Sequence, residues 1–236
     1  MVEHRLSPSQ HLAWIRENVD VVLAVPPDRL EENVVDCPGW RIDSIANHLA
    51  IHGRAYEECV RMPVGGNWAE GFAVAYAAES PSEGQAAVER CRLRNDELLA
   101  ILGGMDPSAP CPFFDGDADV AAWLWHVAAE TWVHRADVEH TLGVTPDLDP
   151  EAGFDALDWS RYWRVWFSEQ DAVDPPPAIR CQAIDSDEVV VVGSGTVAAS
   201  VSGKGCDLAL RLWNRQHGPL EGDGGAVQAW ADLPLA

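Results

Sequence analysis

The chain has 236 residues, 47% of them hydrophobic and 23% charged, which is enough for a sizeable core in one large domain or in two. Its 16 basic residues against 38 acidic ones give a formal net charge of -22, and this charge argues against nucleic acid and anionic membranes as partners. The six cysteines form no C-x-x-C pair, and neither an apolar leader nor a run of ~18 apolar residues is present, which predicts a reduced, soluble, cytoplasmic protein.

The first part of the chain has the pattern of amphipathic helices. Ser7-Pro8-Ser9-Gln10 combines a capping box with proline at the first helical position, and it predicts a helix that ends at Pro26-Pro27. The turn Cys37-Pro38-Gly39-Trp40 precedes a second predicted helix over residues 43–62.

A long loop is expected over residues 63–79, before the next helices. Ser80-Pro81-Ser82-Glu83 repeats the capping-box pattern and predicts a third helix that ends at Gly103-Gly104. After a proline-rich loop, the fourth and longest helix is expected over residues 119–143. Four amphipathic helices of similar length favour a four-helix bundle, in which metal sites face inward.

The rest of the chain predicts a second domain. An aromatic helical stretch over residues 156–166 is expected to pack on the flank of the bundle or at a seam between domains. The run Asp174-Pro175-Pro176-Pro177 cannot be helical and marks a stiff linker. We therefore expect a helical domain over residues 1–173 and a small α+β domain over residues 178–236.

The period of the hydrophobic pattern changes in this second domain. Short β-branched segments separated by turns predict a hairpin or meander, followed by two short helices. The expected strands are residues 178–184, 188–192 and 196–202, and the expected helices are residues 207–213 and 225–233.

Glu130 and His134 are the most informative residues of the chain. A carboxylate and an imidazole four positions apart project from one face of a helix, and His48 on the second helix supplies a third candidate ligand. Two histidines and one glutamate are the ligand set of catalytic zinc sites that keep a fourth position open. His52 and His126 have similar spacing on the same helices, so spacing alone leaves several ligand sets possible.

Several of these motifs resemble the mycothiol-dependent maleylpyruvate isomerase family. The resemblance rests on Cys37-Pro38-Gly39-Trp40, His48-Leu49, the run from Glu130 to Glu139, the run from Gly205 to Arg215, and Glu221-Gly222-Asp223. It implies a DinB-like four-helix bundle followed by the small C-terminal domain of that family. Carried over to this chain, the zinc ligands are His48, Glu130 and His134, and mycothiol is the thiol cofactor or cosubstrate.

The resemblance leaves His52 and His126 as candidates for the catalytic proton shuttle. Isomerases of the family often carry an arginine one turn before the metal-binding glutamate, where this chain has Trp125-His126. Arg135, Arg54 or Arg61 would then have to bind a carboxylate substrate. Specificity for a dicarboxylate is therefore not implied.

Three functions are compatible with these residues. The first is an isomerase or S-transferase in which zinc lowers the pKa of a bound thiol, and the thiolate attacks a small electrophile. The second is a metalloenzyme that activates water on the same fold and needs no thiol. The third is a non-catalytic protein that keeps the bundle to bind a ligand. The first is the one that the resemblance favours.

Overall fold

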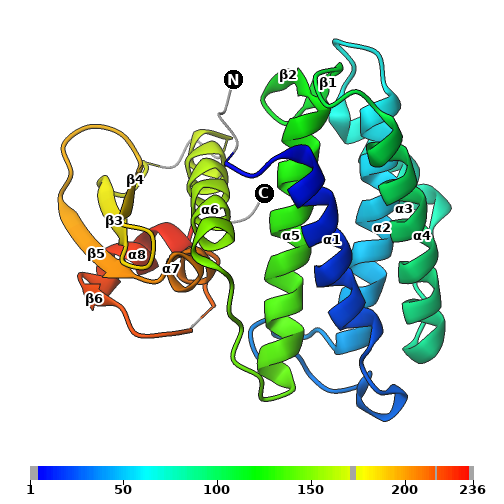
Figure 1. Ribbon diagram of the computed structural model, residues 1–236, viewed down its shortest axis with the longest axis horizontal. Coiled ribbons are helices and arrows are strands. Elements are labelled where there is room, and N and C mark those ends of the chain that lie inside the picture. The colour runs from blue at the N-terminus through cyan, green and yellow to red at the C-terminus, as the bar shows by residue number, and fades with distance from the viewer. Residues whose placement is uncertain (1–4, 171–173, 216, 234–236) are drawn as a thin grey trace. The chain divides into compact units, whose positions relative to one another are not determined.

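The computed structural model describes residues 5–170, 174–215 and 217–233, and its contacts divide the chain into two compact units, Met1–Thr145 and Pro146–Ala236. The first unit is a helical bundle and the second combines helices with a small sheet, which confirms the predicted fold class (Figure 1). The proline run over residues 174–177, where we placed the domain boundary, lies inside the second unit. Residue 173, the predicted end of the first domain, lies outside the described residues, and the predicted division stays a prediction.

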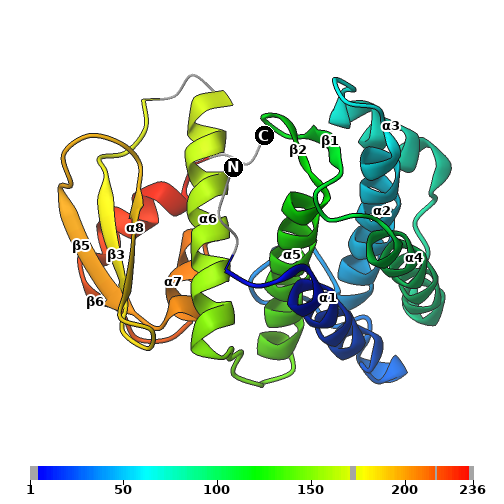
Figure 2. The same cartoon turned by 45° about the horizontal axis from the view of Figure 1, so that its top comes forward.

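Four long helices form the bundle: α1 (Pro8–Leu23), α2 (Ile42–Arg61), α4 (Gly84–Gly104) and α5 (Val120–Thr141). Helix α1 packs against α4 and α5, and α2 closes the ring by packing against the same two helices (Figure 2). The predicted cap of α1 is present, because the Ser7 hydroxyl accepts a hydrogen bond from the Gln10 backbone N–H at 3.3 Å, and the Gln10 side chain accepts one from the Ser7 N–H at 2.9 Å.

Three features of this unit were not predicted: a helix, a hairpin and a short helical turn. The expected loop over residues 63–79 contains helix α3 (Trp68–Ala78), and the proline-rich segment forms a hairpin of β1 (Pro110–Phe113) and β2 (Gly116–Asp119). Prolines are tolerated there because both strands are edges. The short helix η1 (Pro27–Arg29) follows α1.

The predicted capping box before α4 is wrong, because α4 begins at Gly84. The Ser82 N–H donates to Asn47 Oδ1 at 3.0 Å, and Asn47 Nδ2 donates to the Ser82 carbonyl at 2.6 Å. These bonds to α2 hold the segment in an extended conformation. Tertiary hydrogen bonds have therefore overridden a local capping pattern.

The second unit contains α6 (Pro150–Gln170), a four-stranded sheet and two short helices. Its other elements are β3 (Ile179–Ala183), β4 (Glu188–Val192), β5 (Ala199–Gly203), α7 (Gly205–Leu212), β6 (Glu221–Gly222) and α8 (Gly224–Ala231). The strand order is β4-β3-β5-β6. Strands β3 and β4 form the expected hairpin, but β5 pairs with β3 in parallel, so the three strands do not form a meander.

Helix α6 is built into the core of the second unit. It packs against α7 and β4, and its Trp159 stacks on Trp213 with ring centroids 4.9 Å apart. The buried Arg164 donates from Nε to the Leu212 carbonyl at 2.6 Å. The aromatic residues of α6 therefore serve core packing in this unit.

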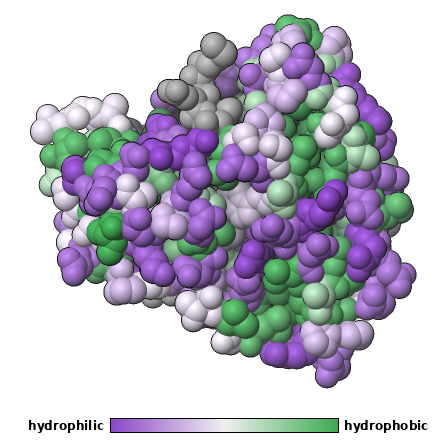
Figure 3. Space-filling view, viewed as in Figure 1, coloured by the Kyte–Doolittle hydropathy of each residue, from purple (hydrophilic) through white to green (hydrophobic). Residues whose placement is uncertain are grey.

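The surface of the protein reflects its composition. On the face seen in Figure 3, hydrophilic side chains alternate with smaller groups of apolar ones. Within residues 5–170, 174–215 and 217–233, no helix combines the length and the hydrophobicity that crossing a membrane requires.

Candidate functional site

Helices α2 and α5 bring His48 together with Glu130 and His134, which lie far from it in the sequence. His48 Nε2 lies 3.1 Å from Glu130 Oε1, and His134 Nε2 lies 3.5 Å from the same oxygen. Glu130 and His134 share a face of α5 because they are four residues apart. The side chains of His48, Glu130 and His134 are 17%, 16% and 8% exposed, so the cluster is largely buried but reachable from solvent.

The turn before α2 covers one side of this cluster. The Trp40 N–H donates to the Cys37 carbonyl at 3.0 Å, and Gly39 has a φ of 89°, a left-handed conformation that favours glycine. The turn places the Trp40 ring parallel to that of His134, at a centroid distance of 5.9 Å. The Cys37-Pro38-Gly39-Trp40 motif thus shapes the site without providing a candidate metal ligand.

Asp137 orients His134 from behind. Its Oδ2 lies 3.0 Å from His134 Nδ1 and also accepts a hydrogen bond from the Cys37 thiol at 3.3 Å. A carboxylate on one imidazole nitrogen fixes the ring and its tautomer, and leaves the other nitrogen for a metal. We did not predict this role from the sequence, although the spacing of three residues after His134 on a helix was a usable signal.

His52 and His126 belong to one hydrogen-bonded chain. His52 Nδ1 lies 3.0 Å from the Tyr56 hydroxyl and His52 Nε2 lies 3.3 Å from the Tyr76 hydroxyl. His126 Nε2 lies 3.1 Å from the same Tyr56 hydroxyl. The ring centroids of His52 and His48 are 3.7 Å apart, so the hydrogen-bonded chain begins next to the cluster. Neither tyrosine was predicted as part of the site: Tyr56 lies on the predicted helix α2 but was not singled out, and Tyr76 lies on α3, which was not expected.

Glu130 and His134 form a charge pair within the cluster. Burial opposes ionisation of Glu130, but hydrogen bonds from His134 and His48 outweigh it and hold the pKa of the carboxyl well below its usual range. Burial also acts to lower the pKa of His134, yet its bonds to Asp137 and Glu130 raise that pKa to about 9. Without a metal, Glu130 is therefore anionic and His134 carries the compensating proton.

The neighbouring histidines are neutral at pH 7. Burial, with a smaller contribution from the charge of His134, lowers the pKa of His48. Burial and the nearby His48 hold the pKa of His52 well below its usual value, and burial lowers the pKa of His126 to about 4. Neutral imidazoles can accept a proton or bind a metal.

Two sets of three ligands share His48 and Glu130. Ligand atoms of His48, His52 and Glu130 lie within 4.8 Å of one another, and His134 approaches the same Glu130 oxygen. Both nitrogens of His52 contact tyrosine hydroxyls, whereas His134 bonds Asp137 through Nδ1 and turns Nε2 to Glu130. Two imidazoles and one carboxylate suit zinc in either set, and the bond to Asp137 favours His134 as the third ligand.

Arg135, which the sequence suggested as a catalytic residue, contacts side chains outside this cluster. Arg135 Nε donates to Glu139 at 2.9 Å, and its Nη1 donates to Asn18 of α1 at 3.4 Å. Arg54 and Arg61 pair with Glu57 of their own helix. The structure brings none of these three guanidinium groups to Glu130 through these contacts.

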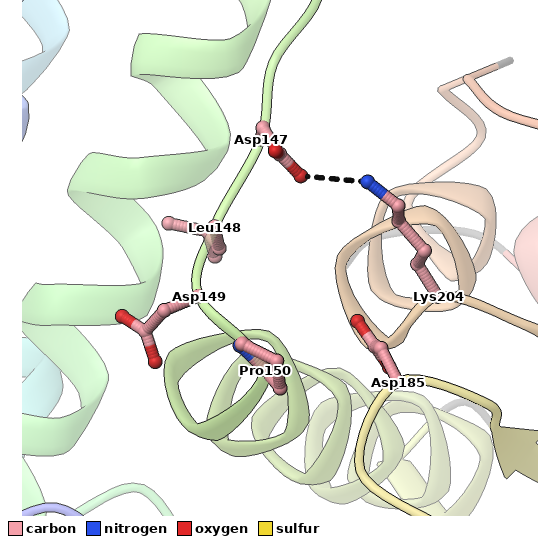
Figure 4. Close-up of a pocket in the computed structure, with 6 residues that line it drawn as sticks. All are labelled: Asp147, Leu148, Asp149, Pro150, Asp185 and Lys204. Carbon is pink, nitrogen blue, oxygen red and sulfur yellow. Dashed lines mark hydrogen bonds and ion pairs between the residues drawn. The ribbon is translucent and has the colours of Figure 1, made fainter.

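A cavity of about 450 Å³ lies in the second unit around Lys204, the only lysine of the chain. It is lined by Asp147, Leu148, Asp149, Pro150, Asp185 and Lys204 (Figure 4). Its carboxylates already have structural partners: Asp147 pairs with Lys204 at 3.1 Å, and Asp185 accepts the Gly205 N–H at 3.0 Å. Asp149 accepts backbone N–H groups at the start of α6.

Comparisons with known proteins bear on the bundle and on the fold as a whole. Two crystal structures are similar, one of the mycothiol-dependent maleylpyruvate isomerase and one of a histidine-to-alanine mutant of it. Each is 14% identical and covers 95% of this chain and 97% of the other, with TM-scores of 0.67 and 0.71 respectively. At this identity the likeness shows a shared fold.

No curated protein sequence matches the chain. A family model matches residues 11–139, which is more than half of the chain. This range includes His48, Glu130 and His134. By this match, the chain belongs to the family described as mycothiol maleylpyruvate isomerase N-terminal domain.

Proposed function

We propose that the protein is a zinc- and mycothiol-dependent enzyme that isomerises a small electrophile, or transfers the thiol to it. The observation that carries this proposal is the meeting of His48 and His134 on one oxygen of Glu130, with Asp137 behind His134. Membership of the family and the fold shared with a mycothiol-dependent isomerase support it. Six free cysteines fit a reducing cytoplasm as its location.

His48, Glu130 and His134 would hold the zinc ion in this proposal. Zinc with two neutral imidazoles and one carboxylate keeps an open position, where it lowers the pKa of a thiol. The anionic Glu130 would offset part of the metal charge, and Asp137 holds His134 so that its Nε2 faces Glu130 and would be available to a metal. Trp40, stacked on the His134 ring, would limit the access of water to the ion on that side.

The proton of the thiol needs an acceptor next to the cluster. His52 is neutral and adjoins His48, so it is placed to accept this proton on one nitrogen while a tyrosine hydroxyl hydrogen bonds to the other. The Tyr56 hydroxyl links His52 to His126, which extends the chain into the bundle. The hydroxyl of Tyr76, a residue that is 56% exposed, contacts the other nitrogen of His52.

The bond changes of the isomerisation balance without an oxidant. The sulfur forms a bond to the alkene carbon β to the conjugated carbonyl, and the π electrons of the alkene move through the α carbon to the carbonyl oxygen. The carbon–carbon bond, now single, rotates. The reverse step breaks the carbon–sulfur bond, restores the alkene in its other geometry and releases the thiol, which recovers its proton from His52.

The test compares wild-type protein with Glu130→Gln and with the control Glu139→Gln. The control removes a carboxylate of the same helix that pairs with Arg135. We expect wild type and control to hold about one zinc per chain by elemental analysis and to bind mycothiol in a calorimetric titration. Glu130→Gln should lose both on the order of tenfold or more. Zinc binding without any heat from mycothiol would contradict the thiol-dependent function and favour metal-activated water.

A further inference from the structure

Helix α3 places a stripe of aromatic side chains beside the cluster. Trp68, Phe72 and Tyr76 are four residues apart, so they share one face of the helix. The Phe72 ring lies 5.3 Å from that of His52, and the Tyr76 hydroxyl lies 3.3 Å from His52 Nε2. The stripe thus ends on the imidazole that adjoins His48.

The turn of the β1–β2 hairpin adds a fourth ring. Phe114 lies 4.8 Å from Trp68 and 5.0 Å from His126, measured between ring centroids. We call Trp68, Phe72, Tyr76 and Phe114 the aromatic wall. It is formed by α3 and the hairpin, neither of which the sequence predicted.

The aromatic wall is more accessible than the core behind it. Trp123 and Tyr56 are buried, at 0% and 3% exposure, whereas Trp68, Phe72 and Phe114 are partly exposed and Tyr76 is 56% exposed. Rings that only filled the core would be excluded from water to the same degree as Trp123. A ligand that approaches the cluster along α3 would therefore meet aromatic surface.

The charged residues of α3 and of the hairpin are acidic, and Arg94 of α4, near the end of α3, pairs with Glu79. Glu70 is the only charged residue of α3, and the hairpin carries Asp115, Asp117 and Asp119 without a basic residue. Every arginine within α2 and α5 pairs with a carboxylate of its own helix, namely Arg54, Arg61 and Arg135. A substrate with two carboxylates would find repulsion here and no uncommitted guanidinium on the helices that carry the cluster.

We propose that the aromatic wall makes this site selective for an uncharged, aromatic-sized α,β-unsaturated carbonyl compound rather than a dicarboxylate. This inference rests on the proposed function, because it names the class of electrophile that the thiol would attack. The rings of Phe72 and Phe114 provide apolar and stacking contacts for a planar conjugated substrate.

The experiment measures binding without thiol, so that no reaction intervenes. Zinc-loaded wild type is titrated calorimetrically with cis-benzylideneacetone, a neutral phenyl enone, and with maleylpyruvate, a dicarboxylate. We expect the enone to bind at least about tenfold more tightly. Phe114→Ala should weaken enone binding at least about fivefold, whereas Val74→Ala, an exposed residue of α3, should leave it unchanged.

The outcomes separate this inference from the proposed function. Equal or tighter binding of maleylpyruvate, no measurable binding of the enone, or an unchanged affinity in Phe114→Ala overturns the selectivity. The same samples are then titrated with mycothiol. If mycothiol fails to bind while the enone binds through Phe114, the proposed function fails and the selectivity of the site stands.

Discussion

Asp137 determines which nitrogen of His134 faces Glu130. Its carboxylate accepts from His134 Nδ1 and from the Cys37 thiol, and it is fully buried. A buried carboxylate with this role raises the basicity of the imidazole and prevents the ring from turning. Its effect on the cluster should therefore be visible in metal affinity.

We expect Asp137→Asn to weaken zinc binding by about 10–100-fold, because the amide neither stabilises the same tautomer nor adds basicity to His134. The measurement is competition with a chelator of known zinc affinity. Asp43→Asn is the matched control: Asp43 is another buried carboxylate of the bundle, and it bonds the Gly84 N–H at 2.9 Å. Equal zinc affinity of Asp137→Asn and wild type would contradict the role of Asp137.

His126 should make folding depend on pH. Burial lowers the pKa of His126 from the usual 6.5 to about 4. Between these two pH values the imidazole is protonated in the unfolded chain but neutral in the folded chain, so the proton favours unfolding. The contribution of His126 is therefore complete above pH 6.5 and lost as the pH falls. The loss between pH 7 and pH 4 amounts to about 3 kcal/mol in the free energy of unfolding.

His126→Gln removes the titrating group and keeps a hydrogen-bonding side chain next to Tyr56. Urea unfolding of metal-free wild type and variant at several pH values checks the prediction. The wild type should lose stability more steeply between pH 6.5 and pH 4, and carboxylates common to both proteins cancel in the comparison. A difference in stability that does not vary with pH would show that His126 does not titrate in this range.

At the scale of elements, the long helices were predictable because local signals agree with packing. The cap at Ser7 and the apolar spacing of Ile15, Val19 and Val22 match the cap and the buried face that α1 has in the structure. Helix α3 was missed because its exposed side is also apolar, with Val74 47% exposed, so it lacks the usual contrast between two faces. The β1–β2 hairpin was hidden by its prolines.

The candidate site also has a part that the sequence predicted and a part that it did not. Spacing on a helix places Glu130 beside His134, and the order of the helices brings His48 to them. Tyr76 contacts His52 from a helix that the sequence did not reveal. A hydrogen bond between side chains of two separate elements depends on tertiary packing, which no local pattern specifies.

The contact of α3 with α2 depends on Gly71. A Cβ atom at Gly71 would lie 2.8 Å from Cys59 Sγ and 3.3 Å from the Cys59 backbone nitrogen. Gly71→Ala should therefore lower the free energy of unfolding, since overpacking costs about 1–3 kcal/mol and exceeds the gain in helix propensity. At Gly104 nothing lies within 4 Å of such a Cβ.

Gly104→Ala is the control, and it should raise the free energy of unfolding by up to about 1 kcal/mol. Urea denaturation of both variants measures the two effects, which have opposite signs for the same chemical change. Stabilisation by Gly71→Ala would mean that α3 moves away from α2 at little cost.

At the scale of the whole molecule, the two units and the predicted domains differ in where they place α6. Trp159 and Arg164 attach this helix to Trp213 and Leu212 of the second unit. A fragment of residues 1–145 should therefore be helical by circular dichroism, monomeric, and able to bind zinc. A fragment of residues 1–173 should associate, because it exposes the aromatic side of α6.

Size-exclusion chromatography of both fragments makes this comparison. A monomeric, more stable 1–173 fragment beside an aggregating 1–145 fragment would favour the boundary at the proline run over residues 174–177.

His48 and Glu130 are 82 residues apart in the chain. The proposed zinc ion, bound to both, would link these distant segments as a cross-link does. Under the proposed function, a bound zinc ion would favour the folded state over the unfolded one. Each tenfold rise in free zinc above the dissociation constant then adds about 1.4 kcal/mol to the stability of the folded state. The abundance of this protein in the cell would thus follow the supply of zinc, since the metal-free protein unfolds more often and is degraded faster by proteases.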